Sequence, residues 1–166
     1  YVLAAGSGVK FRELMSSGNV VSWRATYPLL LRRKLKTGDL LDYAWIAPPP
    51  GSSLLEHLRI LLQSQATTEI KIRYSGGSLT SAINYMKQTD ALTVLPHSVV
   101  FAFRKEKSIT ALPVAIPHPE RALGLLRLAD TPRAPAVDAF ARHIRQSFDN
   151  LKHLIKRHEQ AVVWGM

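Results

Sequence analysis

The sequence predicts an α/β domain with a mostly parallel sheet and flanking helices. Apolar, β-branched segments alternate with helix-like segments in the order β-α-β-α-β-α-β-α-β-β-α, which is typical of a parallel sheet covered by helices. Apolar residues make up 46% of the 166 residues, enough to bury a core in one domain or two small lobes. No apolar run approaches the roughly 20 residues of a membrane-spanning helix, so we expect no membrane contact.

In the first half of the chain, predicted strands are short and apolar, and predicted helices follow polar capping residues. The β-branched segment 19–24 predicts a strand, and the polar segment before it contains an amphipathic piece around Phe11–Met15. Ser53 and Glu56 form the pattern S-x-x-E, a capping box that starts a helix. The other expected elements are a short helix over 38–43 capped by Thr37, a strand over 44–47, and the capped helix to about residue 64 with Leu54, Leu55, Leu58, Leu61 and Leu62 on its apolar stripe.

In the second half, Glu69–Tyr74 alternates charged with apolar residues, as a half-exposed strand does. Ser78 follows two glycines and is expected to cap a helix to about Lys87. Further along, we expect strands over 91–95, 109–112 and 122–128, a helical turn over 97–103, and a long helix that starts at Thr131 or Ala134, has Pro135 near its first turn, and runs toward His158.

The charge balance is strongly basic, with 22 Lys and Arg against 12 Asp and Glu and a formal charge of +10. Such a charge attracts polyanions such as nucleic acid. The cations are spread along the chain, however, and no basic run carries interleaved aromatic residues, so we favour a basic soluble domain over direct nucleic-acid binding by these residues. There is no cysteine, which excludes disulfides and cysteine-ligated metal sites.

Three predicted strands run directly into helix starts and define a candidate binding site. The junctions are Ala47 into PPPGSS, Tyr74 into SGGS and Leu95 into PHS. Each offers free backbone N–H groups and the positive end of a helix dipole, at the strand ends where open α/β sheets bind ligands. Serines that only cap helices are the simpler alternative. The candidate effector-binding residues are Pro50, Gly51, Ser52, Ser53, Ser75, Ser78 and His97, a set that suits a carboxylate or a small polar solute.

Catalytic and metal-binding patterns are weak. The chain has no G-x-S-x-G elbow, its histidines lack the spacing of three or four residues that helical metal sites use, and its acidic residues form no spaced pair. We therefore expect no enzyme activity, no metal and no cofactor, and a small α/β enzyme is the weakest alternative. The second half of the last helix, Leu151–Trp164, extends past what one small sheet needs, and we hypothesise an oligomer contact there.

Three stretches, in order, resemble the sequence pattern of LysR-type transcriptional regulators over about residues 20–148. They are TYPLLLRRKLKTGDLLDYAWIAPPPGSSL, IRYSGGSLTSAINYMKQTDALTVLPHSVV and ITALPVAIPHPERALGLLRLADTPRAPAVDAFARHIRQSF. The chain departs from the pattern at Tyr27, where His is usual, and at Thr89-Asp90, where Gly-x-Gly is common; the second change is expected to stiffen that turn. The residues after Phe148 extend beyond the pattern.

The resemblance implies a periplasmic-binding-protein-like (type 2) effector domain of two α/β lobes that bind a small inducer between them. Residues 1–19 would end the first lobe or form a linker, 20–112 would form the second lobe, and 113–166 would return to the first lobe as a strand and a long helix. Most of the first lobe is not in the chain, so the apolar stripe of that helix should be under-covered. By position, residues 49–53, then Ser75 and Ser78, then Pro96 and His97, match the loops that face the effector in this family.

The expected function is therefore ligand sensing in a cytoplasmic LysR-type regulator. The resemblance implies a small-molecule effector, a homo-oligomer, and DNA contact only through an N-terminal helix-turn-helix outside this chain. The three strand-to-helix junctions favour an anionic effector. The alternative is a solute-binding protein of a transport system with the same fold, which a signal peptide upstream would favour.

Overall fold

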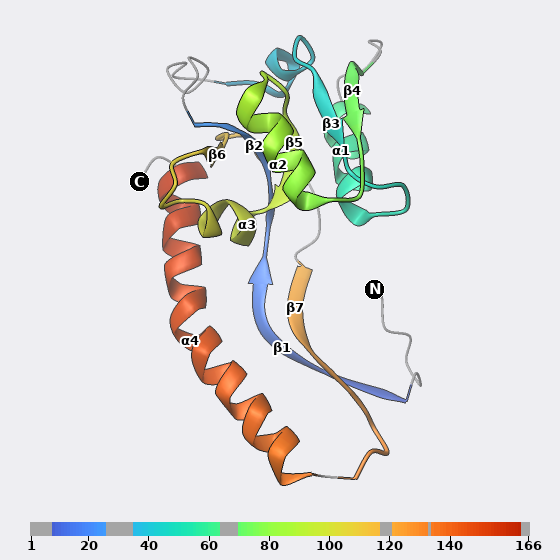
Figure 1. The fold of residues 1–166 in the computed structure, drawn as a ribbon, viewed down its shortest axis with the longest axis vertical. Coiled ribbons are helices and arrows are strands. Elements are labelled where there is room, and N and C mark those ends of the chain that lie inside the picture. The colour runs from blue at the N-terminus through green and yellow to red at the C-terminus, as the bar shows by residue number, and fades with distance from the viewer. Residues whose placement is uncertain (1–7, 26–34, 64–69, 117–120, 133, 164–166) are drawn as a thin grey trace.

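The chain forms two parts, which are visible in the computed structural model of residues 8–25, 35–63, 70–116, 121–132 and 134–163 (Figure 1). The described residues between 19 and 116 form one part, which we call the body. We call the other part the arm; it consists of β1 (Val9–Ser17), β7 (Arg121–Leu128) and α4 (Pro135–Val163). The chain crosses from the arm to the body at Gly18, between β1 and β2.

The body is built on one sheet with the strand order β4-β3-β5-β2-β6. β3 and β4 pair in parallel, and a parallel bridge between Trp45 and Leu92 joins β3 to the start of β5. β2 pairs antiparallel with both β5 and β6. The strands are β2 (Asn19–Arg24), β3 (Trp45–Ala47), β4 (Ile72–Ser75), β5 (Thr93–Pro96) and β6 (Ile109–Ala111).

The predicted α/β class is confirmed, and the sheet of the body is mostly parallel in strand direction, with β2 as its antiparallel exception. Four of the described strands run in one direction, and β2 runs against them. Parallel neighbours need a crossover segment, which α1 (Ser53–Gln63) and α2 (Leu79–Gln88) supply between β3, β4 and β5. β2 is not preceded by such a crossover. The chain enters it directly from β1 through Gly18.

Two apolar clusters form the core, one on each face of the body sheet. Neighbouring strand residues point to opposite faces, so Val21 and Trp45 belong to one cluster, while Val20 and Ile46 belong to the other. α1 covers the first face with the predicted stripe of Leu58, Leu61 and Leu62. On the other face lie α2, with Ala82, Ile83 and Met86, and α3 (His97–Ala102), with Val100.

Several predicted boundaries differ from the structure. The piece around Phe11–Met15 is part of the nine-residue strand β1, which sequence reasoning missed. The helix expected over 38–43 is a single 3-10 turn, Thr37–Leu40, capped by Lys36 rather than by Thr37, and the Asp39 carboxylate accepts a 2.9 Å bond from the Lys36 N–H. β4 begins at Ile72, whereas Glu69 and Ser64 lie outside the described residues.

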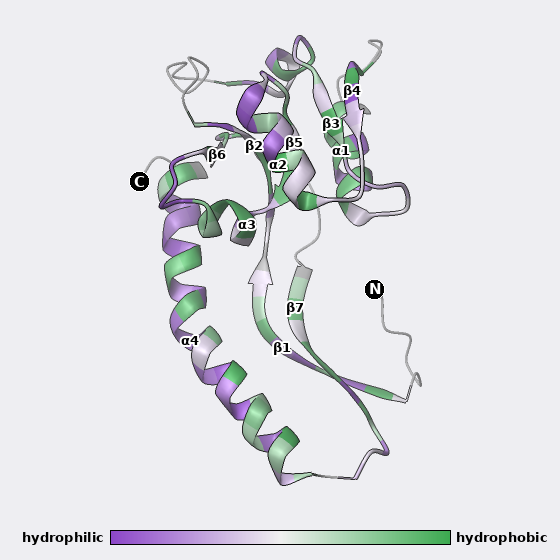
Figure 2. Cartoon of the chain, in the orientation of Figure 1, coloured by the Kyte–Doolittle hydropathy of each residue, from purple (hydrophilic) through white to green (hydrophobic). Residues whose placement is uncertain are grey.

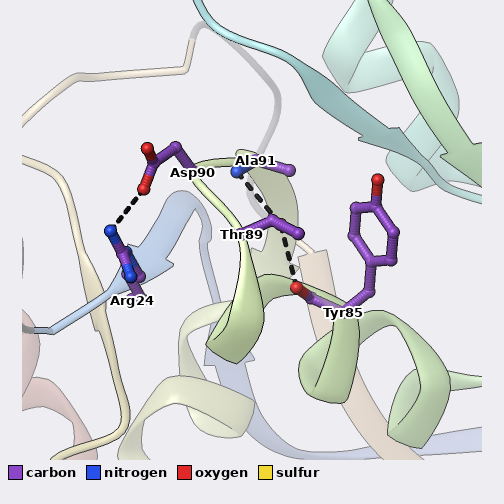
Figure 3. Close-up of polar contacts among 5 residues, drawn as sticks. All are labelled: Arg24, Tyr85, Thr89, Asp90 and Ala91. Carbon is purple, nitrogen blue, oxygen red and sulfur yellow. Dashed lines mark hydrogen bonds and ion pairs between the residues drawn. The ribbon is translucent and has the colours of Figure 1, made fainter.

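The turn between α2 and β5 is held by side chains, as its departure from the family pattern predicts (Figure 3). The Thr89 hydroxyl donates to the Tyr85 carbonyl at 2.9 Å and accepts from the Ala91 N–H at 3.4 Å. Asp90 forms an ion pair with Arg24 of β2 at 2.5 Å. Thr89 and Asp90 therefore fasten this turn to α2 and to the last residue of the crossing strand β2.

The long helix α4 begins at the second of its two predicted starts. The Ala134 carbonyl accepts from the Asp138 N–H at 3.1 Å, and Pro135 occupies the first helical position. α4 has 29 residues and continues past His158. Near its start, Val137 and Phe140 are 54% and 65% exposed, which confirms the expected under-covered stripe (Figure 2).

The second half of α4 packs on its own chain, which corrects our reason for expecting an oligomer contact there. Ile155 forms a small buried cluster with Met15 of β1 and Phe101 of α3, and Phe148 and Leu151 pack against this cluster. The neighbouring Leu154 is 49% exposed. Within the described residues, no helix combines the length and apolar character needed to cross a membrane.

Candidate functional site

The β3–α1 junction is a tight turn with an open outer face. The Ser52 N–H donates to the Pro49 carbonyl at 3.1 Å, and Gly51 has a φ of +74°. Pro50 followed by a glycine with positive φ is the signature of a type II turn. Among the described residues, no heavy atom lies within 4 Å of where a Gly51 Cβ would sit, so this part of the backbone faces open space.

Ser52, rather than Ser53, caps α1. Its Oγ accepts from the Leu55 N–H at 3.2 Å, and its carbonyl accepts from the Glu56 N–H at 3.3 Å. The predicted capping box of Ser53 and Glu56 is therefore wrong by one residue. The reason is the left-handed backbone of Gly51, because it completes the turn at Ser52 and leaves that residue at the cap. The Glu56 carboxylate oxygen Oε2 instead lies 3.9 Å from Nη1 of Arg59.

The β4–α2 junction lies beside the first one. Ser75 is the last residue of β4 and is opposite Ala47 in the parallel register. Ser78 caps α2, as predicted, with its Oγ accepting from the Ser81 N–H at 3.3 Å. A Cβ at Gly77 would lie 3.9 Å from the Pro49 ring, so the two loops are in van der Waals reach of each other.

Two helix N-termini thus meet at one edge of the sheet, which faces the arm in Figure 1. Pro50, Gly51, Ser75 and Ser78 are exposed at this edge, while Ser52 and Ser53 are partly buried. The first N–H groups of α1 and α2 and the dipoles of both helices favour an anion here. The capping hydroxyls remain able to donate, because an oxygen that accepts from the backbone still carries its own proton.

His97 does not join this group of serines. It is fully buried at the first position of α3, where its N–H donates to the Gly18 carbonyl at 2.9 Å. Its Nε2 lies 2.9 Å from Nδ1 of His158 on α4. Burial, and then the charge of His158, lowers the pKa of His97 to about 4, so the imidazole is neutral at physiological pH.

A cavity of about 610 Å³ lies between β1 and the second half of α4, and His97 forms part of its wall. Nδ1 of His97 is buried without a hydrogen-bond partner among the described residues. No group of three metal-binding side chains occurs in the described part of the chain. The cavity is lined by Glu13, Leu14, Met15, Ser16, Gly18, His97, Lys152, His153, Ile155, Lys156 and Glu159, and thus by none of the candidate serines.

Sequence reasoning missed a second buried contact near the crossing point. His57 of α1 is buried, and its Nδ1 lies 2.5 Å from Nδ2 of Asn19, the first residue of β2. A signal was present, because His57 follows Leu54 by three residues and precedes Leu61 by four, on the apolar stripe of α1. No such signal pointed to His158, because its partner, His97, lies 61 positions away in the sequence.

A body of α/β topology joined by crossing strands to a second part defines a ligand-binding domain of the periplasmic-binding-protein-like type. Solved structures of this class are similar. They include the CcmR regulatory domain of Synechocystis PCC6803 in complex with 2-PG (TM-score 0.69, 17% identity, 86% of this chain and 68% of that one). The effector-binding domain of QuiR in complex with shikimate gives a TM-score of 0.64 at 17% identity, covering 90% of this chain and 69% of that one. The reduced OxyR regulatory domain of Pseudomonas aeruginosa gives 0.63 at 20% identity, covering 87% and 70%.

The chain belongs to the LysR substrate binding domain family, whose sequence model matches residues 3–149. A curated relative is the HTH-type transcriptional regulator GbpR of Azospirillum brasilense, 24% identical over 140 residues. This alignment covers 84% of the chain and 41% of the relative, so the chain spans about two fifths of the relative's length.

Proposed function

We propose that this chain is the effector-sensing part of a LysR-type transcriptional regulator and binds a small anion, such as a carboxylate, at the β3–α1 and β4–α2 junctions. The observation that carries the proposal is the meeting of two capped helix N-termini at one edge, with Gly77 against Pro49. Similar regulatory domains in complex with 2-PG and with shikimate support a small-molecule ligand.

The two lobes are assigned as the sequence suggested. We assign residues 1–19 to the end of the first lobe or a linker, residues 20–112 to the second lobe, and residues 113–166 to the return into the first lobe, which begins after Val114 and Ile116 complete the core of the body. An effector held between the lobes would change their relative angle, and the complete regulator would pass this change to an N-terminal helix-turn-helix that binds DNA. The domain does no chemistry on its ligand, uses no cofactor, and works in the cytoplasm.

The proposed regulator is a homo-oligomer, and exposed apolar side chains on the arm support this. Phe140 of α4 and Leu126 and Leu128 of β7 are among the most exposed large apolar residues of the chain. Such surfaces are typical of sites that another protein part covers.

Aspartate variants test the site while they preserve the helix caps. Asp is as good an N-cap as Ser, but its carboxylate repels an anion. We expect Ser52→Asp and Ser78→Asp in the full-length protein to keep their melting temperatures and to lose binding of small carboxylates in a calorimetric screen. Asn84→Asp, at an exposed position in the middle of α2 and away from its N-terminus, is the charge control. Carboxylate binding that survives in both cap variants would show that the site lies elsewhere.

A further inference from the structure

The second half of α4 extends beyond the part of the chain that matches the family. The family match ends at residue 149, whereas α4 continues to Val163. In Figure 1 this part of the helix runs alongside the body, next to α3 and β6. We call residues 150–163 the strap.

Apolar contacts of the strap reach both parts of the molecule. Ile155 is 4% exposed and is buried between Met15 of β1, in the arm, and Phe101 of α3, in the body. About two turns later, Val162 packs against the second core cluster of the body, which includes Ile83 and Val100. The strap therefore contacts β1 on one side and the core of the body on the other.

Polar contacts of the strap gather at the crossing point of the chain. His158 pairs with His97 at 2.9 Å, and its ring meets Phe101 edge-on at a centroid distance of 5.5 Å. The same His97 donates its backbone N–H to the Gly18 carbonyl. The Glu159 carboxylate lies so close to Gly18 that a Cβ there would be 2.8 Å from Oε1. Gly18 is thus held between the strap and α3.

We infer that the strap fixes the angle between the arm and the body and thereby regulates the proposed effector site. The chain crosses from the arm to the body at Gly18 and returns to the arm between Ile116 and Arg121, so a rotation of the two parts moves Phe101 and His97 relative to Met15. Ile155 contacts both Met15 and Phe101, and His158 joins α4 to α3 of the body, so rotation must break some of these contacts. An effector that changes the lobe angle therefore has to offset the contacts that the strap loses.

The inference deepens the proposed function, but its test needs no effector, so the two can fail independently. Spin labels at Asn84 of α2 and at Asp130, beyond β7, report the distance between the parts; both positions are exposed. They are introduced as cysteines in a cysteine-free background of the full-length protein, and these 166 residues contain no cysteine of their own. The labelled protein is measured without ligand by pulsed electron spin resonance.

Ile155→Ala is the variant that loosens the strap, and Leu154→Ala is its control, with the same kind of truncation at a half-exposed neighbour. We expect the Ile155→Ala distance distribution to broaden at least twofold, and the Leu154→Ala distribution to match the wild type. His158→Ala, which leaves the apolar cluster in place, should broaden it too and is the variant to measure if Ile155→Ala does not fold. Distributions of Ile155→Ala and His158→Ala that superpose on the wild type would overturn the inference.

Discussion

Nε2 of His97 lies 2.9 Å from Nδ1 of His158, and this pair joins the end of β5 to the far half of α4. Both imidazoles have a lowered pKa. For His97 the main cause is burial, followed by the charge of His158; for His158 it is burial, followed by Arg104. The pair is therefore held in its neutral form, with one ring nitrogen donating and the other accepting.

Stability should fall as the pH drops from 6.5 toward 4. The unfolded chain protonates its histidines near 6.5, while folded His97 resists protonation until about 4, so the unfolded state binds more protons in this window. The shift on this buried group corresponds to roughly 3 kcal/mol, which is fully present above pH 6.5. Urea unfolding at a series of pH values measures the effect.

Several charged groups surround the His97–His158 pair. They are Arg104, in the turn after α3, Glu13 of β1, and Lys152, His153, Lys156 and Glu159 of α4. His97→Gln removes the buried titrating group and should flatten the pH dependence between 6.5 and 4. His143→Gln, at an exposed position of α4, should leave it unchanged. An identical slope in wild type and His97→Gln would contradict the assignment.

The contact of Asn19 with His57 should contribute a measurable coupling energy to the free energy of unfolding. Both side chains are buried, and replacing His57 by Leu deprives the Asn19 amide of a partner in a low-dielectric setting. We expect a loss of about 1–3 kcal/mol in urea unfolding. A double-mutant cycle with Asn19→Ala isolates the pair, and strictly additive effects would show that the two side chains do not depend on each other.

Ser52 and Ser53 should respond differently to the same substitution. Ser52 bonds the Leu55 N–H as the cap of α1, while Ser53 is the first helical residue. Ser52→Ala should therefore cost about 1 kcal/mol, and Ser53→Ala less than about 0.5 kcal/mol. Chemical denaturation of the two variants decides the point, and a larger loss for Ser53→Ala would restore the capping box that the sequence alone suggested.

Local patterns predicted the elements that depend on local chemistry. The apolar stripe of α1, the Ser78 cap and the start of α4 after Ala134 each rest on residues within four positions of one another. The cap of α1 was missed by one residue because the S-x-x-E pattern does not register the positive φ of Gly51. Patterns of this kind describe hydrogen bonds inside a helix but not the backbone conformation of the turn that precedes it.

Long-range contacts account for the rest. β1 was not recognised because its alternation of charged and apolar residues breaks at Glu13, where a bulge interrupts the register, and because its only described partner strand, β7, lies more than a hundred residues away. His97 was grouped with the serines by its place after a strand, yet its side chain turns to α4 because a helix 61 residues later offers His158. Neither contact has a signature in the neighbouring sequence.

Gly124 of β7 should be intolerant of any side chain. It pairs with Glu13 where a bulge interrupts the β1–β7 register, and a Cβ would overlap the Phe11 ring and lie 2.5 Å from the Arg12 carbonyl oxygen. Because the second obstacle is backbone, relief requires the two arm strands to separate, so Gly124→Ala should cost roughly 1–3 kcal/mol. Gly77→Ala is the control, since its new Cβ would make an ordinary 3.9 Å contact with Pro49. Thermal unfolding of both variants checks this, and a loss no larger for Gly124→Ala than for Gly77→Ala would mean that the arm strands are more loosely paired than their register indicates.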